Sequence, residues 1–201
     1  MTSHPLLELP LPCDCVCVCV CVCDLSSSAS HPARRVLASS SIDWYSVHLK
    51  PITGVKNLVC AGIVAMAIGL GALATGGGAA SIRMVWRPMA AVAGLIWHRE
   101  MVMDIKDADG DRLAGVRTVA VACGAKRALY LSLLPLAAGA AAAATAAGGG
   151  GALAMLAAVP LMLQGAISLS ASMRGFSPRA LDEAIELAPL WLLCSLVALT
   201  V

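Results

Sequence analysis

Two long stretches without a charged residue constrain the fold of this chain more than any other feature. Residues 58–82 contain no charge across 25 positions, and residues 128–173 contain none across 46. A helix needs about 20 apolar residues to cross ~30 Å of hydrocarbon. The first stretch is therefore long enough for one span, and four glycines at 148–151 divide the second into two candidate helices. The pattern predicts an all-α fold, and more narrowly a multi-span transmembrane helix bundle.

Two shorter apolar runs raise the expected number of helices to about five. Residues 88–103 can serve as a span only if their polar end faces the interior of the bundle. Residues 187–201 form a last run of 15, after a polar loop in which Pro178 favours a helix start. The glycine-rich end of the first stretch predicts that its helix ends near Thr75.

Charged and polar residues between these runs receive simpler assignments. Arg83 and Arg87 are expected in the loop that follows the first span. His98 is more often a packing or interfacial histidine than a metal ligand in such a position. Pro160 is expected to kink its helix, which membrane helices tolerate when neighbouring groups satisfy the backbone.

The amino-acid composition supports closely packed membrane helices. Hydrophobic residues make up 59% and charged residues 13%, against about 45–50% and about 25% in soluble proteins. With only one Phe and two Tyr, the apolar content is mostly small and aliphatic, which lets helix backbones approach each other. The net charge of +2 comes with no basic patch interleaved with aromatic residues, so we expect no nucleic-acid partner.

The N-terminal residues 1–43 carry no convincing domain and are expected to be low-complexity or disordered. Cysteine alternates with valine between Cys15 and Cys23, which superficially suggests a strand. The spacing does not suit a tetrahedral zinc site, and a translated dinucleotide repeat or a faulty gene start explains it more simply. The membrane domain is therefore expected over residues 44–201.

Acidic residues gather in residues 99–118, which read REMVMDIKDADGDRLAGVRT. Five of the twelve acids of the chain lie there, namely Glu100, Asp104, Asp107, Asp109 and Asp111. Such density is repulsive unless water, a cation or a basic ligand compensates it. Read as one helix, all except Asp109 share a face, with Gly110 and Gly115 marking the exit into a loop. A face of carboxylate oxygens suits Mg2+, which takes one or two carboxylates together with substrate phosphates.

Three other interpretations of the acidic stretch compete with a Mg2+ site. A solvated charged face remains open as an alternative. A calcium EF-hand loop counted from Asp107 fails, because its sixth position is Arg112 instead of Gly and its twelfth is Thr118 instead of Glu. The Asp-rich signature of enzymes that transfer phospho-alcohols fails as well, because the next acid after Asp111 is Asp182.

The same stretch resembles the second Asp-rich motif of the UbiA family of intramembrane prenyltransferases. It is closest in look to members that resemble geranylgeranylglycerol-phosphate geranylgeranyltransferases. The matching residues are Arg99, Glu100, Asp104, Asp107, Gly110, Asp111, Arg112, Gly115 and Thr118. A second segment, YSVHLKPITGVKN at residues 45–57, is also similar to a stretch that introduces a membrane helix in this family.

The resemblance implies Mg2+-dependent transfer of a prenyl group from a prenyl diphosphate to a lipid or aromatic acceptor within the bilayer. The residues that it assigns to catalysis and to the metal are Asp104, Asp107 and Asp111, with Glu100 as a weaker metal ligand one turn deeper. The basic residues that could pair with diphosphate oxygens are Lys106, Arg112, Lys126 and Arg127. Asp109, which lies off the shared face, is expected to be solvated.

The chain also departs from the family pattern. Family members carry two Asp-rich motifs on about nine membrane helices, and no NDxxDxxxD motif lies upstream of residue 58. The expected fold is therefore a partial one, and a competing hypothesis is a non-catalytic membrane helix bundle, either a degenerate fragment or a partner subunit. Twelve of the fourteen Lys and Arg residues would lie on one side of a five-span topology. The positive-inside rule then places the Asp-rich loop on the cytosolic, stromal or matrix face.

Overall fold

The computed structural model describes residues 54–76, 78–145 and 151–200, and the expected N-terminal segment 1–43 lies outside them. The described residues form helices joined by short turns and contain no strand. The helices are α3 (Val55–Ala74), α4 (Gly78–Lys106), α5 (Ala108–Leu113), α6 (Val119–Cys123), α7 (Ala125–Ala144), α8 (Gly151–Met173) and α9 (Pro178–Thr200). The all-α expectation is confirmed.

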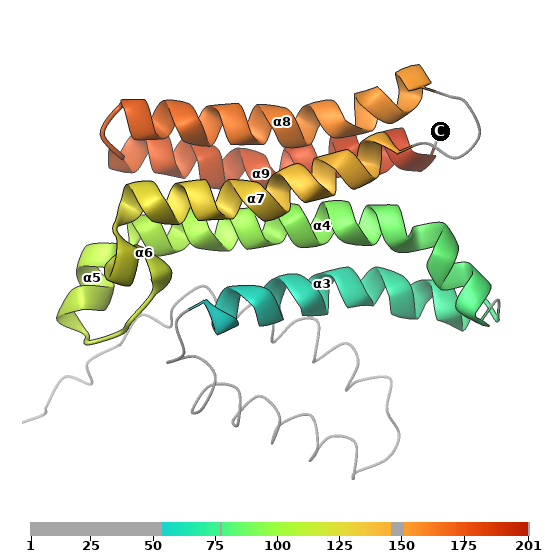
Figure 1. Ribbon diagram of the computed structural model, residues 1–201, viewed down its shortest axis with the longest axis horizontal. Helices are drawn as coiled ribbons and strands as arrows, with labels where there is room; N and C mark the ends of the chain where they lie inside the picture. The colour runs from blue at the N-terminus through green and yellow to red at the C-terminus, as the bar shows by residue number, and fades with distance from the viewer. Residues whose placement is uncertain (1–53, 77, 146–150, 201) are drawn as a thin grey trace, which may run out of the picture. The chain divides into compact units, whose positions relative to one another are not determined.

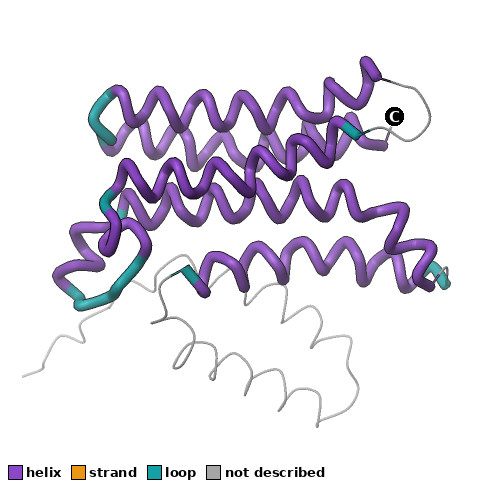
Figure 2. Tube along the Cα trace, viewed as in Figure 1, coloured by secondary structure: helices purple, strands orange, loops and turns teal. Residues whose placement is uncertain are grey.

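Five long helices run alongside one another as a bundle, with their turns at the two ends (Figures 1 and 2). Helix α4 is central, because it packs against α3, α7 and α9. Helices α7 and α8 pack together, as do α8 and α9. The two short helices α5 and α6 lie at one end, between α4 and α7 (Figure 1).

Several helix boundaries agree with the sequence. Helix α3 ends at Ala74, one residue before the expected Thr75, and α9 begins at Pro178. Arg83 and Arg87, however, lie inside α4 and not in a loop. The break is confined to the glycine run, where Gly76 and Gly78 have positive φ angles, and good helix formers follow at once. Pro88 removes only one backbone hydrogen bond, so the helix continues through it.

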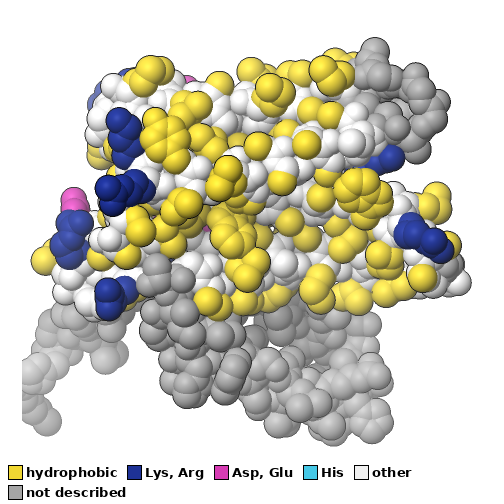
Figure 3. All heavy atoms as spheres, viewed as in Figure 1, with side chains coloured by type: hydrophobic (Ala, Val, Ile, Leu, Met, Phe, Trp, Pro, Cys, Tyr) yellow, Lys and Arg dark blue, Asp and Glu magenta, His cyan; other side chains and the backbone are white. Residues whose placement is uncertain are grey.

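The interior of the bundle combines alanines with larger side chains such as Leu95, Met101 and Leu161, and other large apolar residues face outward. The buried positions of α4, α7 and α8 include Ala91, Ala128, Ala140 and Ala157. The exposed apolar side chains include Met66, Leu70, Leu131, Leu134, Met155, Met162, Leu190 and Leu193. In Figure 3, Lys and Arg side chains lie at the two ends of the bundle, and apolar side chains cover the face between these ends. This distribution is typical of helices that pack in lipid.

Three of the long helices are apolar and long enough to cross a membrane among the residues that the structure describes. They are α3, α7 and the Met155–Met173 part of α8. Helix α4 carries charged residues near both ends, and α9 carries them in its first turns. The polar end of α4 packs inside the bundle, as its sequence required, because His98, Glu100 and Asp104 are all buried.

Helices α4 and α7 approach most closely at two glycines. A Cβ atom on Gly94 would collide with the backbone carbonyl oxygen of Pro135. A Cβ atom on Gly139 would lie 2.9 Å from the carbonyl oxygen of Ala90. Only residues without a side chain allow this separation of the two backbones.

His98 lies in the buried core between α7 and α8 and contacts one serine on each. Its Nδ1 is 2.9 Å from Ser132 Oγ, and its Nε2 is 2.8 Å from Ser168 Oγ. The Ser132 hydroxyl donates to the Leu129 carbonyl oxygen at 2.7 Å, so its oxygen is left to accept from Nδ1–H. Nε2 then accepts from Ser168, which makes a neutral imidazole with both nitrogens bonded. The expectation that His98 is a packing histidine is confirmed.

We expect Gly94→Ala to destabilise the bundle by about 1–3 kcal/mol, the usual cost of overpacking a core. The added methyl group meets backbone and not a movable side chain. Thermal unfolding of the purified chain in detergent measures the effect. Gly62→Ala on α3 is the matched control, because nothing lies within 4 Å of its Cβ position. Equal melting temperatures for the two variants would contradict this account.

We expect Ser168→Ala to lower the free energy of unfolding by about 1–3 kcal/mol, since it leaves a buried ring nitrogen of His98 without its donor. Ser172→Ala is the control on the same helix, because the Ser172 side chain is half-buried and makes no contact with His98. Unfolding in detergent by heat or denaturant compares the two. A loss that is no greater for Ser168 than for Ser172 would show that this hydrogen bond does not stabilise the core.

Candidate functional site

The acidic residues lie where α4 leads into α5 and α6. The expectation of one unbroken helix through Asp111 is wrong, because α4 ends at Lys106 and Asp107 separates it from α5. The segment DADGD is rich in residues of low helix propensity, which explains the interruption. The turn stays tightly wound, since Asp107 N–H donates to Met103 O and Asp111 N–H donates to Asp107 O, both at 2.9 Å.

The exit into the loop comes later than the two glycines suggested. Gly110 lies inside α5, and Gly115, with a φ of 72°, follows it. The backbone N–H of Val116 returns to bond the carbonyl oxygen of Asp111 at 2.8 Å. This closed turn holds the acidic segment against the end of the bundle.

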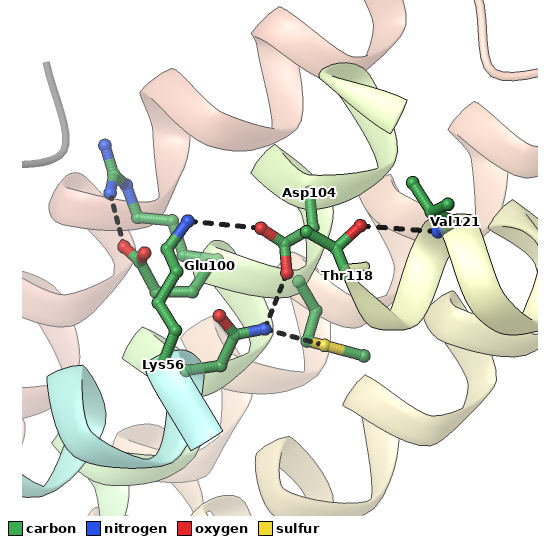
Figure 4. Close-up of polar contacts among 8 residues, drawn as sticks. Lys56, Glu100, Asp104, Thr118 and Val121 are labelled. Atoms are coloured by element: carbon green, nitrogen blue, oxygen red, sulfur yellow. Dashed lines mark hydrogen bonds and ion pairs between the residues drawn. The ribbon is translucent and has the colours of Figure 1, made fainter. Parts of the chain in front are cut away.

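Asp104 is the centre of the polar contacts at this end of the bundle. Its side chain is 4% exposed and receives one donor on each oxygen, both from the first turn of α3. Lys56 Nζ lies 3.2 Å from Oδ1, and Asn57 Nδ2 lies 2.8 Å from Oδ2. Figure 4 shows the Lys56 amine directed at the Asp104 carboxylate. A buried carboxylate requires such pairing, so these contacts fix α3 to the end of α4.

Asn57 has one polar atom that these contacts do not satisfy. The residue is 1% exposed, and its Nδ2 also lies 2.9 Å from Met101 Sδ. Its Oδ1 has no hydrogen-bond partner among the described residues. A buried amide oxygen left unpaired costs about 1–3 kcal/mol, so an acceptor beside Asp104 remains available to a donor or a cation.

Asp111 shares the electrostatic environment of Asp104. Partial burial raises the pKa of the Asp111 carboxyl above its ordinary value, and the nearby Asp104 and Asp107 carboxylates raise it further. The Lys56 ammonium and a hydrogen bond with the Thr118 hydroxyl act in the opposite direction on this pKa. Three predicted metal ligands therefore lie close enough to repel each other, which is the condition that a bound cation relieves.

Thr118 also fixes the start of α6. Its hydroxyl accepts a hydrogen bond from the backbone N–H of Val121 at 3.3 Å, as an N-cap residue does. Figure 4 shows this bond between Thr118 and Val121. One side chain thus connects the α6 cap with the acidic turn.

Glu100 lies one turn deeper than Asp104, as expected, and is buried. Its Oε1 lies 3.3 Å from Arg99 Nη1, so its charge is already compensated by a neighbour.

The predicted diphosphate-binding residues all lie at this end but do not converge. Lys106 pairs with Asp182 of α9 at 2.6 Å, and Arg112 pairs with Asp109 at 2.9 Å. The Asp109 side chain is 95% exposed, so the expectation that it is solvated is confirmed. Both basic side chains are well exposed, and exposed ion pairs are weak enough to exchange for a ligand. Lys126 and Arg127 are exposed in the first turn of α7.

The residues present suit Mg2+ only together with a second source of oxygen ligands. Within the described ranges, no three carboxylate, imidazole or thiol side chains come together around one ion position. Mg2+ does not need such a cage, because it is commonly held by one or two carboxylates plus substrate phosphates and water. The repulsion around Asp111 and the unpaired oxygen of Asn57 both favour a cation here.

Sequence reasoning missed the contribution of α3. Lys56 and Asn57 were assigned to a segment that leads into a membrane helix, and neither was expected to contact Asp104. The available signal was their position, because they are the only charged residue and amide in an otherwise apolar α3.

Most of the chain is similar to known proteins of one family. The model of the UbiA prenyltransferase family matches residues 37–193, which is more than half of the sequence. The chain belongs to the UbiA prenyltransferase family. A segment of 88 residues is 34% identical to the digeranylgeranylglyceryl phosphate synthase of Natronomonas pharaonis and covers 44% of this chain. That segment covers 31% of the archaeal protein, and no solved structure matches this chain significantly.

Membership of the UbiA family agrees with the structure on two points. The family is embedded in the membrane, and the described part of this UbiA protein has three helices that are apolar enough to cross one. The matched range also includes both α3 and the acidic turn, so the residues that surround Asp104 all belong to the shared domain.

We expect Asn57→Ala to destabilise the chain by about 1.5–3 kcal/mol, as for other hydrogen bonds to a charged group. The substitution removes the donor on Asp104 Oδ2 and leaves that oxygen buried. Asp109→Ala is the control, because it breaks an ion pair that is exposed to solvent. Thermal unfolding in detergent measures the stability of both variants. A larger loss of stability in Asp109→Ala than in Asn57→Ala would show that the hydrogen bond to Asp104 is not a main contribution to the fold.

Proposed function

We propose that this UbiA-family chain takes part in Mg2+-dependent transfer of a prenyl group from a prenyl diphosphate to an acceptor within the membrane. The observation that carries the proposal is the buried Asp104 carboxylate, which lies near enough to Asp111 to raise its pKa, at the polar end of a bundle with a largely apolar outer face. A charged diphosphate and a long apolar tail need these two environments side by side. Family membership supplies the class of reaction.

In this proposal one or two carboxylates among Asp104, Asp107 and Asp111 would hold the cation together with diphosphate oxygens, and Glu100, one turn below, would be a weaker ligand. Bound Mg2+ supplies the positive charge that stabilises a departing diphosphate. Asn57 keeps the Asp104 carboxylate in position through the Nδ2–Oδ2 hydrogen bond of 2.8 Å. Buried apolar helices exclude water from the reacting carbon.

The basic residues of the same end would bind the diphosphate oxygens. Lys106, Arg112, Lys126 and Arg127 lie on α4, α5 and α7 at the end of the bundle that carries the acidic turn, although they do not converge on one point. Lys106 and Arg112 must leave exposed acidic partners to do so, which costs little because solvent already weakens those pairs. Arg112 brings a planar guanidinium that suits two phosphate oxygens at once.

The acceptor and the membrane side belong to the same proposal. The name of the archaeal relative is that of a lipid-phosphate synthase, which favours a glycerol-phosphate lipid over an aromatic acceptor. The Lys106–Asp182 ion pair joins the acidic turn to the start of α9, so both polar segments share one end of the bundle. The excess of basic residues at that end favours the cytosolic, stromal or matrix face.

A non-catalytic membrane bundle is the second candidate. It is favoured by the position of α3, whose substantial packing among the described helices is with α4 alone. In this reading the chain contributes half of a cavity to a partner subunit or has no activity of its own.

We expect the double variant Asp104→Ala, Asp107→Ala to lose Mg2+-dependent prenyl transfer by at least about a hundredfold, the usual scale for removing electrostatic stabilisation of a leaving group. The assay follows labelled geranylgeranyl diphosphate into a glycerol-phosphate lipid, in membranes with Mg2+ or EDTA. It uses this chain, and in parallel the chain extended by coding sequence found upstream in the full-length transcript. Asp109→Ala is the control and should retain activity.

Two results would overturn the assignments. Activity that survives in the double variant would show that the acidic turn does not hold the metal. A transcript that adds no second Asp-rich motif, with no transfer to any acceptor in the presence of Mg2+, would favour the non-catalytic bundle.

A further inference from the structure

Lys56 supplies the positive charge that pairs with the buried Asp104 carboxylate. Its ammonium nitrogen lies 3.2 Å from Asp104 Oδ1, and its side chain is 16% exposed. The charge of this buried carboxylate is therefore balanced by a residue of α3, 48 positions away in the sequence. Figure 4 shows that Lys56 reaches the carboxylate from the opposite side to Thr118.

The charge of Lys56 acts on the second carboxylate as well as on the first. Its positive charge lowers the pKa of the Asp111 carboxyl, whereas the Asp104 and Asp107 carboxylates raise that pKa. One ammonium thus serves the acidic turn as a shared counter-ion. A divalent cation bound to Asp104 would lie close to this ammonium, and the repulsion between the two positive charges would weaken binding of the cation while Lys56 stays paired with Asp104.

The neighbouring Asn57 indicates what kind of ligand can bind next to Asp104. Its Nδ2 is engaged by Asp104, while its buried Oδ1 is without a partner among the described residues. An amide oxygen is an acceptor and a hard ligand, so it suits a cation or a water bound to one. A phosphate oxygen would not pair with it, since both groups are acceptors.

We propose that Lys56 is an exchangeable counter-ion, which neutralises Asp104 in the free protein and yields that carboxylate to a divalent cation when a diphosphate enters. The displaced ammonium then pairs with the diphosphate. This inference rests on the proposed function and adds to it a role for Lys56. A lysine suits the role, because its flexible stem can carry one charge between two partners a few ångströms apart.

The exchange makes metal binding depend on the diphosphate. Without a diphosphate, the metal competes with Lys56 for Asp104 and binds weakly. With a diphosphate, the ammonium has a new anionic partner, and the metal and Lys56 bind together. A lysine that only stabilised the fold would not produce this dependence.

The test measures binding of Mn2+ to the purified chain in detergent by electron paramagnetic resonance, with and without inorganic diphosphate. For Lys56→Met we expect Mn2+ alone to bind at least about tenfold more tightly than in the unaltered chain, because one adjacent charge commonly shifts an ionic equilibrium by a factor of ten or more. With diphosphate present, the order should reverse, and the variant should bind Mn2+ more weakly.

Two controls and one substitute variant separate this inference from the proposed function on which it rests. Arg174→Met removes one positive charge from the Arg174–Glu183 pair at the start of α9 and should change neither affinity. Lys56→Arg keeps the charge and should not tighten binding of Mn2+ alone. If Lys56→Met does not fold, Lys56→Gln keeps a donor without the charge and carries the same expectation.

The outcomes are distinguishable from failure of the proposed function. Binding of Mn2+ that Asp104→Ala abolishes, but that Lys56→Met leaves unchanged, would retain the metal site and overturn the exchange. Binding that is insensitive to Asp104→Ala would overturn the proposed metal site itself, and the exchange with it. Tighter binding in Lys56→Met together with the reversal in diphosphate supports both.

Discussion

The close approach of α4 and α7 is the constraint on which the rest of the bundle depends. Gly94 and Gly139 let the two backbones meet without intervening side chains. His98 follows Gly94 by one helical turn on the same face of α4, and this separation brings its ring within hydrogen-bond distance of Ser132. Ser168 of α8 completes the arrangement from the other side. Three helices are thereby held in one register, and the end of α4 that carries Asp104 is positioned by it.

The sequence predicted the elements whose causes are local, and it missed those that arise from packing. The end of α3 near Thr75 and the start of α9 at Pro178 follow from glycine and proline chemistry, and the structure has both. The continuation of α4 through Arg83 and Arg87 was missed, because charged residues in an apolar chain suggested a loop. In the structure they occupy helical positions toward the far end of the bundle, where a helix carries charge without difficulty.

The acidic site divides in the same way. The five acids and their family resemblance were readable from spacing alone, as was the solvated position of Asp109. The interruption at Asp107 could not be read from the sequence, because the carboxylate spacing fits one continuous helix as well as two consecutive helices. The contacts of Lys56 and Asn57 with Asp104 join residues almost fifty positions apart, and only the packing of α3 against α4 creates them. The position of Lys56 and Asn57 in an otherwise apolar helix marks them as unusual, but it does not identify Asp104 as their partner.

The position of α3 at the edge of the described bundle has a thermodynamic consequence. This helix packs substantially against α4 alone, and its polar anchor is the pair of donors on Asp104. Any ligand that changes the bonding of that carboxylate therefore changes the free energy with which α3 is attached, and the reverse holds equally, because linked equilibria are reciprocal. A cation at Asp104, as proposed above, would therefore be coupled to the attachment of α3 to α4.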